Sequence, residues 1–232
     1  MIKYRQALEA MWVLAREPFE FVALNKMTDA VSLSGPTQWW YRRLLADKPA
    51  EQLAYLRELT RRPIDVEYLT GLPENTLGYQ YAAFCEANGI TPGGHVAAVP
   101  QLVDTFAKDW VTHRFFKIHD VLHVVGGFGA DVPGEMGLQM FDALNLREPY
   151  GIGAILSTPY MMLFYGQPVR MIRQIIRGAR IAASGQNLFF APLEDMWEWD
   201  LEAVRGHLGI DLRLAGQQPL LRRGVAARDA RG

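Results

Sequence analysis

Four residues with metal-binding side chains fall within seventeen positions of this 232-residue chain: His119, Asp120, His123 and Glu135. They form the pattern His-Asp-x-x-His, eleven residues, Glu, although the whole chain holds only 5 histidines. Imidazole nitrogens and carboxylate oxygens suit Zn²⁺ and, in varying degree, Fe²⁺, Mn²⁺ or Mg²⁺. The pattern therefore predicts a divalent metal site and leaves the identity of the metal open.

Helical geometry explains how the first three of these residues can share a site. Two histidines four positions apart lie one turn apart on the same face of a helix, and Asp120 lies about 100° around from His119. Glu135 cannot join them on that helix, because twelve further residues carry it about 18 Å along the axis. The chain must therefore reverse its direction between His123 and Glu135.

The intervening residues contain the signals for such a reversal. Glycines permit a helix to end with positive φ, and a proline followed by a glycine suits the first turn of a new helix. These residues are Gly126, Gly127, Gly129, Pro133 and Gly134. We therefore predict a metal site on a helical hairpin, in which Glu135 returns to the two histidines.

Other interpretations of the same residues must be weighed. A single buried histidine is more often a core residue than a ligand, and Asp120 alone is compatible with a solvated charge. Metalloprotease helices have the same histidine spacing, but there a glutamate directly follows the first histidine and acts as the base. Because Asp120 holds that position here, we reject a protease.

The composition indicates a globular protein. Half of the residues are apolar and the formal net charge is -1, which gives no indication of nucleic-acid binding. Cys85 is the only cysteine, so an intramolecular disulfide is excluded and a reducing, cytoplasmic compartment is expected. Lys3, Arg5 and Glu9 interrupt any apolar run at the start of the chain, so no signal peptide is expected.

Helical periodicity dominates the chain, and we predict an all-α fold in a single multi-helix domain. The domain is expected to cover residues 1–212, followed by a flexible C-terminal tail at 213–232. Loops are expected at Gly35-Pro36 and Pro92–Gly94, and Ile64–Leu69 is left unassigned. The predicted helices cover Tyr4–Arg16, Phe19–Val31, Pro49–Leu59, Asn75 or Thr76 to Ala87, Pro100–Ala107, Val111–Val125, Glu135–Leu144, Ile152–Tyr165, Val169–Ala183 and Leu193–Leu208.

The segment Pro149–Val169 carries no charged residue and is strongly apolar. Glycines and prolines interrupt it, so a membrane-spanning helix of about 20 residues is not expected. One interpretation is a buried core helix. The other is an apolar wall, including Met161 and Phe164, that faces a membrane or a long isoprenoid chain.

Four arginines follow this segment, at positions Arg170, Arg173, Arg177 and Arg180. On a helix they fall within an arc of about 80°. They form either a solvated helix face or a surface for anionic lipid headgroups or an acidic substrate group, where each arginine contributes about 1 kcal/mol near an anionic membrane. The apolar segment and the arginines together suggest a peripheral membrane protein.

The metal motif and its two flanking segments resemble the coenzyme Q (ubiquinone) biosynthesis protein 4 family. The hallmark of that family is His-Asp-x-x-His, eleven residues, Glu, which the chain matches without a gap. Upstream, Leu72–Phe84 is similar to Leu-Pro-x-Gly-Ser-Leu-Gly-x-x-Tyr-x-x-Phe, with Asn75 in place of a glycine. Downstream, Trp197–Ile210 is similar to a Trp-Glu…Leu-Gly-Ile helix, so the resemblance covers residues 72–210.

This resemblance implies a helical, membrane-associated protein of ubiquinone biosynthesis. In it His119, Asp120, His123 and Glu135 would hold a divalent metal, usually assigned as zinc. The implied activity is removal of the C1 carboxyl group of a polyprenylated hydroxybenzoate, coupled to hydroxylation of that carbon. The implied partners are the prenylated benzoate or quinone lipid, the other ubiquinone biosynthesis enzymes, a membrane surface and further copies of the chain. We then expect a cytoplasmic protein, peripherally associated with the inner (cytoplasmic) membrane.

The implied chemistry is physically reasonable. A divalent metal acts as a Lewis acid on a phenolate or carboxylate oxygen. Zinc cannot handle dioxygen by redox change, so an oxidative step requires a redox metal such as Fe²⁺ or direct reaction of the electron-rich ring. His113 is a candidate hydrogen-bond partner of the metal site or an acid–base group, and it is equally compatible with a surface position.

Two other functions remain open. One is a non-catalytic scaffold that binds a prenyl lipid and uses the metal only to hold the hairpin. The other is a metal phosphohydrolase with an adjacent His-Asp pair, which requires an earlier histidine and a later aspartate at the metal. His95 and Asp142 are weak candidates for those two positions.

Overall fold

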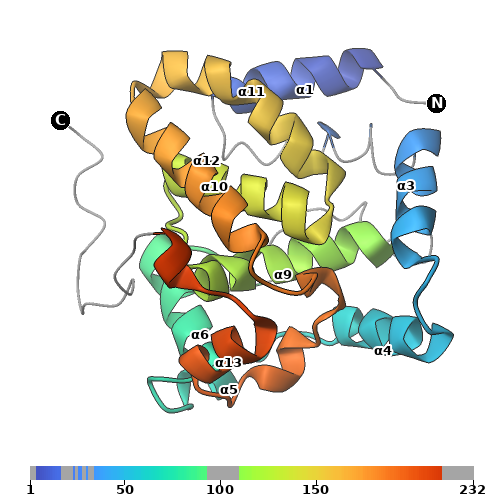
Figure 1. Ribbon diagram of the computed structural model, residues 1–232, viewed down its shortest axis with the longest axis vertical. Helices are drawn as coiled ribbons and strands as arrows, with labels where there is room; N and C mark the ends of the chain where they lie inside the picture. Colours follow the sequence, from blue (N-terminus) through green and yellow to red (C-terminus); the bar gives the residue numbers. More distant parts are fainter. Residues whose placement is uncertain are drawn as a thin grey trace.

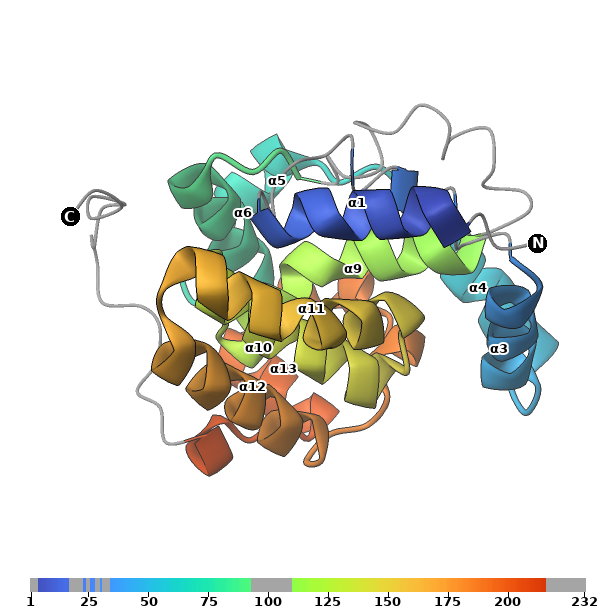
Figure 2. The ribbon, with the colours of Figure 1, turned by 90° about the horizontal axis from the view of Figure 1, so that it is seen from above.

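The helices of this chain are arranged around one long helix near the centre. A computed structural model describes residues 4–16, 23, 26–27, 30, 34–92 and 110–215. Within these ranges every regular element is a helix, and the extended pairing is limited to an isolated bridge between Thr76 and Asp200. The predicted all-α class is therefore confirmed (Figures 1 and 2).

The elements follow one another through short connections. A π-helical turn, η1, spans Asp142–Leu146, and 3-10 turns cover Leu188–Phe190, Leu193–Met196 and Leu212–Ala215. The described α-helices are α1 (Tyr4–Arg16), α3 (Gly35–Leu45), α4 (Ala50–Arg61), α5 (Val66–Thr70), α6 (Leu77–Asn88), α9 (Trp110–Gly126), α10 (Val132–Phe141), α11 (Pro149–Tyr165), α12 (Pro168–Ala182) and α13 (Leu201–Leu208).

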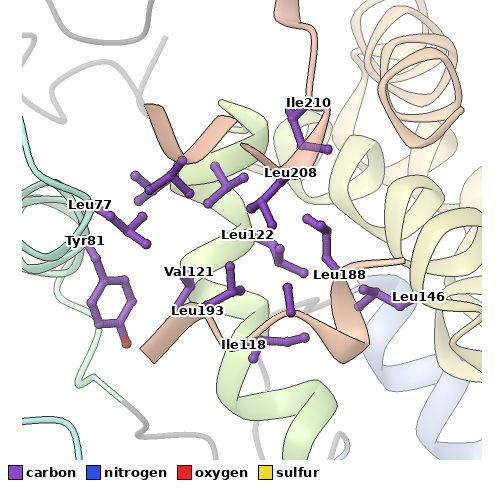
Figure 3. Close-up of a cluster of buried hydrophobic side chains, with 14 of the residues drawn as sticks. Leu77, Tyr81, Ile118, Val121, Leu122, Leu146, Leu188, Leu193, Leu208 and Ile210 are labelled. Atoms are coloured by element: carbon purple, nitrogen blue, oxygen red, sulfur yellow. The ribbon is translucent and has the colours of Figure 1, made fainter. Parts of the chain in front are cut away.

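Helix α9 forms the centre of the core, with α4, α6, α10 and α13 around it (Figures 1 and 2). Its side chains Ile118, Val121 and Leu122 belong to a buried cluster that also contains Leu193 and Leu208 (Figure 3). Full burial of one such side chain stabilises the fold by about 1.5–3 kcal/mol. The apolar side chains of α9 therefore fix its position, and with it the position of its polar residues.

Two basic side chains of α9 are buried together with an acidic partner. Arg114 has no exposed side-chain surface and donates a hydrogen bond to Glu194. Lys117 lies 3.5 Å from the same carboxylate and donates to the carbonyls of Leu59 and Arg62 at the end of α4. Burial lowers the pKa of Lys117, and the nearby Glu194 opposes that shift. These contacts tie α9 to α4 and to the turn that contains Glu194.

The loop predicted at Gly35-Pro36 is wrong, because these two residues begin helix α3. The Ser34 hydroxyl accepts a hydrogen bond from the Thr37 N–H at 3.3 Å. A proline fits the first turn of a helix because the N–H that it lacks has no partner there. The unassigned segment Ile64–Leu69 contains the start of the short helix α5, which Asp65 caps.

The helix predicted over Leu193–Leu208 is interrupted by contacts with α6. The segment begins as a 3-10 turn and becomes helical again only at α13. Between these elements the carbonyls of Trp197 and Trp199 accept hydrogen bonds from Gly78 and Leu77, each at 2.9 Å. Because this backbone pairs with the first turn of α6, it is not available to continue the helix.

The remaining predictions divide into confirmed and untested ones. The other predicted helices are confirmed to within a few residues at each end wherever the structure describes them. The predictions for Pro100–Ala107, for His95 and for most of Phe19–Val31 lie outside the described residues. The division into a domain at 1–212 and a flexible tail at 213–232 stays a prediction, since residues 216–232 also lie outside the described residues.

Among the described helices, none combines the length and the hydropathy that a membrane crossing requires.

Candidate metal centre

The end of α9 turns the chain back directly after the second histidine of the motif. Gly127 adopts φ 64°, a left-handed conformation that glycine enters without strain. The Phe128 N–H donates to the His123 carbonyl at 2.8 Å, which closes the last turn of the helix. The histidines therefore lie in the last turns of α9, beside the point where the chain reverses.

The start of α10 then brings Glu135 back toward α9. Asp131 accepts a hydrogen bond from the Gly134 N–H at 3.0 Å, and Pro133 occupies the first turn. A Cβ on Gly134 would lie 2.2 Å from the Gly129 carbonyl oxygen, so this close approach requires glycine. These local contacts fix Glu135 in the first turn of α10.

The Glu135 carboxylate lies between the two histidines of α9. Its Oε1 is 3.1 Å from His119 Nε2, and its Oε2 is 3.2 Å from His123 Nε2. One potential ligand atom from each of His119, Asp120 and His123 lies within 4.8 Å of the other two. The return of Glu135 to the histidines, predicted from the sequence, is confirmed by these distances.

The other nitrogen of each imidazole contacts a hydrogen-bond acceptor. His119 Nδ1 is 3.0 Å from Asp142 Oδ2, and His123 Nδ1 is 3.3 Å from the Phe128 carbonyl oxygen. Because a carbonyl oxygen only accepts, His123 Nδ1 carries a proton and donates it, and the same assignment at His119 holds when Asp142 is ionised. The Nε2 atoms then face Glu135, and in neutral imidazoles they hold the lone pairs that bind a metal.

Two further side chains hold the polar groups of this cluster in place. Phe84 of α6 stacks on the His123 ring, with centroids 5.1 Å apart and planes at 24°. Gln139, one turn after Glu135 on α10, donates to Glu135 Oε1 at 2.9 Å. The ring of His123 and the carboxylate of Glu135 are therefore each held from a second direction.

Two buried arginines cap the end of α9. Arg205 donates to the carbonyls of Val124 and Val125 at 2.7 and 3.0 Å, and Arg177 donates to the Gly126 carbonyl at 2.7 Å. The last carbonyls of a helix have no partner within the helix. The arginines therefore stabilise the end of α9 that carries the histidines.

Burial and charge act against each other on the pKa values of the cluster. Burial lowers the pKa of His119, but the Glu135 and Asp142 carboxylates together hold it well above its ordinary value. Burial raises the pKa of Glu135, but His119 and His123 hold it well below its ordinary value. Burial raises the pKa of Asp142, and the contact with His119 offsets this only in part. A metal bound at His119 Nε2 would therefore compete with a proton for that nitrogen.

Solvent reaches the cluster from one side. Asp120 and His123 are each 2% exposed. The side chains of His119 and Glu135 are 15% and 17% exposed. A ligand can therefore approach beside His119 and Glu135, whereas the core closes the opposite side.

The donor atoms fit a divalent metal ion. Two imidazole nitrogens and the carboxylates of Asp120 and Glu135 make a mixed nitrogen and oxygen set, which zinc and iron both accept. Imidazoles that bind metals usually donate their second N–H to a carboxylate or carbonyl, as both histidines do here. The donor set does not distinguish between zinc and iron.

The remaining predicted site residues lie elsewhere. His113 is 2% exposed, which excludes the surface position considered for it. It precedes His119 by six residues, which separates the two by about 120° around α9. Met161 is buried among apolar residues, whereas Phe164 is 43% exposed on α11.

The predicted face of four arginines is wrong at Arg177, which is buried. Arg170, Arg173 and Arg180 are exposed on α12, but Arg177 is only 4% exposed. Its guanidinium donates to the α9 carbonyl and lies 4.4 Å from the centroid of the Phe128 ring. Arg177 therefore supports the hairpin and is not available to lipid headgroups.

Sequence reasoning named Asp142 only as a weak candidate for the later aspartate of a phosphohydrolase, and it missed the positions of Gln139 and Phe84 in this cluster. A signal existed for Asp142 and Gln139, because Glu135, Gln139 and Asp142 are spaced by four and three residues and so share one helix face. No local signal existed for Phe84, because its contact with His123 joins two helices distant in sequence.

Comparisons with known proteins agree with the motif. The family model described as coenzyme Q (ubiquinone) biosynthesis protein Coq4 matches residues 19–213. The ubiquinone biosynthesis protein COQ4 homolog, mitochondrial, of Aedes aegypti is 27% identical over 171 residues, covering 74% of this chain and 59% of the relative. The Rattus norvegicus protein of the same name is 28% identical over 192 residues, covering 78% and 71%.

A solved structure shows the same fold. A crystal structure of a Nostoc punctiforme protein assigned to ubiquinone biosynthesis superposes with a TM-score of 0.72 at 22% sequence identity. The match covers 91% of this chain and 100% of that chain. This chain spans about three-fifths of the length of the first curated relatives, 59% in Aedes aegypti and 58% in Culex quinquefasciatus.

The expected cytoplasmic location at the inner (cytoplasmic) membrane is wrong by this comparison, because the relatives from Aedes aegypti and Rattus norvegicus are named as mitochondrial proteins. The expectation rested on Cys85 as the only cysteine. Unpaired cysteine indicates a reducing environment, and it does not say which reducing compartment holds the protein.

Proposed function

Because the chain belongs to the coenzyme Q (ubiquinone) biosynthesis protein Coq4 family, we propose that it is a metal-dependent enzyme of ubiquinone biosynthesis. Its substrate would be a polyprenylated hydroxybenzoate, from which it would remove the C1 carboxyl group with hydroxylation of that carbon. It would also organise the other enzymes of the pathway. The reaction and the organising role follow from the family resemblance, and the geometry of the motif residues supports the metal dependence.

The observation that carries this proposal is the convergence of Glu135 on two imidazoles. The carboxylate lies within 3.2 Å of both Nε2 atoms, while both Nδ1 atoms contact acceptors. A buried histidine is satisfied by one hydrogen-bond partner at each ring nitrogen, and two such histidines do not need to share a carboxylate at their Nε2 atoms. An arrangement that aims two Nε2 atoms and a carboxylate at one place is typical of a metal site.

The residues of the chain would contribute binding, orientation and exclusion of water. When bound, a divalent metal supplies a Lewis acid for a phenolate or carboxylate oxygen. The ligands would be the four motif residues, His119, Asp120, His123 and Glu135. Asp142 and the Phe128 carbonyl would hold the two imidazoles in orientation. The closed side of the cluster keeps water out, which strengthens charge interactions with the substrate.

Hydroxylation of the carbon that loses its carboxyl group requires an oxidant. Exchange of a carboxyl for a hydroxyl group adds one oxygen atom and removes two electrons from the substrate. Dioxygen would supply that atom, and two further electrons from a reductant would convert the second oxygen atom to water. Iron in the same donor set can take part in this redox change, whereas zinc cannot. With zinc, the electron-rich ring would have to react with dioxygen directly.

A second function, prenyl-lipid binding without catalysis, is favoured by the surface of α11 and α12. Leu156 and Leu163 are 70% and 77% exposed there. Other large apolar side chains exposed on these helices are Ile152, Tyr160, Phe164, Val169, Ile172 and Ile176. Arg170, Arg173 and Arg180 are exposed on α12 as well. Apolar and basic side chains together suit an anionic membrane surface or a prenylated acid.

The substitution Glu135→Gln separates catalysis from scaffolding. It keeps the shape of the side chain and removes the charge that a metal needs. If the protein is an enzyme, the variant is expected to fold but to hold less metal, which elemental analysis measures. Cells that depend on this protein for ubiquinone are then expected to accumulate the carboxylated intermediate, which mass spectrometry measures. Glu67→Gln is the control, because Glu67 is an exposed carboxylate of α5 outside the motif. Retained ubiquinone production by the Glu135 variant contradicts catalysis at this site and leaves the scaffold.

The lipid surface has its own test. Replacement of Arg170 and Arg173 by glutamate is expected to weaken binding to vesicles that contain anionic lipid, measured by co-sedimentation. Unchanged binding would contradict the membrane proposal.

Association with further copies of the chain stays a prediction. Sedimentation of the purified protein measures its oligomeric state.

A further inference from the structure

Asp142 occupies the same face of the chain as Glu135, two helical turns later. Seven residues separate the two carboxylates, which brings them to within about 20° of one another around the helix axis. Glu135 lies 3.1 Å from His119 Nε2, and Asp142 lies 3.0 Å from His119 Nδ1. The segment that begins with α10 therefore holds both ring nitrogens of a single imidazole from α9.

The position of Asp142 is fixed by the turn that follows α10. Asp142 is 4% exposed and begins the π-helical turn η1, and such turns are frequent at functional sites. Its carbonyl accepts a hydrogen bond from the Glu148 N–H at 3.2 Å. Within the turn, Asn145 donates to the Gln186 carbonyl and accepts from the Leu188 N–H, each at 2.9 Å. The turn is therefore anchored to the rest of the core, and Asp142 has little freedom to move away from His119.

We propose that Asp142 is a positioning residue for metal binding at His119, an inference that rests on the proposed metal site. Asp142 accepts the Nδ1 proton of His119 and so directs the Nε2 lone pair toward Glu135. The two nitrogens lie on opposite edges of the ring, so Asp142 cannot reach a metal bound at Nε2. A carboxylate in this position also makes the imidazole a stronger donor to the metal.

A purely structural role predicts something different for the same contact. A hydrogen bond that only joins α9 to η1 would contribute to the free energy of unfolding and would leave metal affinity unchanged once the protein is folded. A positioning role predicts that metal affinity falls in a protein that remains folded. Metal affinity and its spectrum, measured beside stability, therefore separate the two roles.

The test uses Co²⁺ as the probe on the purified full chain. The dissociation constant is measured by competition with a chelator, and the visible absorption bands report the ligand set. Asp142→Leu removes the acceptor at similar volume, and we expect about 10–100-fold weaker binding with the wild-type band shape. Asp142→Asn keeps one acceptor oxygen but leaves the imidazole orientation less strictly fixed, so we expect a smaller, severalfold loss. Glu67→Gln, at an exposed carboxylate of α5, is the control and is expected to keep the wild-type dissociation constant.

The possible results are distinguishable. Wild-type affinity in both Asp142 variants, beside a loss of tenfold or more in Glu135→Gln, overturns the positioning role and leaves the metal site standing. Altered bands that indicate a lost ligand make Asp142 a direct ligand and also overturn it. A wild-type chain that binds Co²⁺ no better than Glu135→Gln overturns the proposed metal site as well. Thermal unfolding checks each metal-free variant, and if Asp142→Leu does not fold, the severalfold loss expected for Asp142→Asn decides the question.

Discussion

Substitution of Gly178 by alanine tests whether the contact between α10 and α12 positions Glu135 in the candidate metal centre. A Cβ on Gly178 would lie 2.0 Å from the Gly137 carbonyl oxygen and 3.2 Å from the Phe141 nitrogen. Real Cβ atoms essentially never approach a neighbour within 3.0 Å, and the obstacle here is backbone. The two helices must therefore move apart by about 1 Å or more to admit a methyl group.

The expected magnitude has two parts of opposite sign. Overpacking of a well-packed contact destabilises by about 1–3 kcal/mol, and the backbone obstacle places this case at the upper end. Alanine in place of glycine inside a helix stabilises by about 1 kcal/mol. We therefore expect Gly178→Ala to lower the free energy of unfolding by about 2 kcal/mol. Gly206→Ala in α13 is the matched control, because no atom lies within 4 Å of its added Cβ, and we expect it to raise stability by about 0.5–1 kcal/mol.

The assay is urea unfolding of the two variants and the wild type, followed by Co²⁺ titration of the folded proteins. Helix α10 carries Glu135, so separation of α10 from α12 is expected to weaken Co²⁺ binding severalfold in Gly178→Ala and not in Gly206→Ala. Equal stabilisation by both substitutions would show that the close helix contact is absent. Loss of stability with unchanged Co²⁺ affinity would show that this contact does not position Glu135.

The other predictions concern buried charges and the cysteine. Glu194→Ala is expected to lower the free energy of unfolding by about 3–5 kcal/mol, because it removes the counter-charge of the buried Arg114 and Lys117, and a loss below about 1 kcal/mol in urea contradicts this. Burial raises the pKa of Glu148 to about 8, so the folded protein favours the protonated carboxyl. The stability that this preference contributes is complete below the unfolded pKa of 4.5 and is lost as the pH rises through 8. The wild type is therefore expected to lose up to about 5 kcal/mol relative to Glu148→Gln over that range, and parallel pH profiles of urea unfolding would contradict the shift. Burial raises the pKa of Cys85 to about 12, so its thiol is expected to resist iodoacetamide at neutral pH in the folded protein and to react after unfolding, as mass spectrometry measures.

The hairpin could be predicted because its signals are local. Gly127 ends α9 with a positive φ, and Asp131 and Pro133 begin α10, all within a few residues of the histidines. Helical spacing then places His119 and His123 on one face without knowledge of the rest of the fold. The return of Glu135 follows from these local rules, and the contacts at 3.1 and 3.2 Å agree with it.

Other features depend on contacts between segments far apart in the sequence. Arg177 has the same helical spacing as three exposed arginines, and periodicity alone treats all four as one face. Only the position of α9 shows that Arg177 is buried, 51 residues from the Gly126 carbonyl that it contacts. The interruption before α13 is similar, since it depends on backbone contacts from Trp197 and Trp199 to α6. The contact of Asp142 with His119 could not be predicted either, because it depends on how η1 is oriented toward α9.

The end of α9 favours a cation for several independent reasons. The helix dipole places partial negative charge at its C-terminus, and the carboxylates of Asp120 and Glu135 add to it beside the imidazoles. Arg177 and Arg205 bring positive charge to the same helix end, and their guanidinium groups donate to the carbonyls of the last helical turn. The arginines therefore satisfy the helix end without pairing with the motif carboxylates. The donor atoms of the cluster are therefore left for a small cation, which agrees with the proposed binding of a divalent metal.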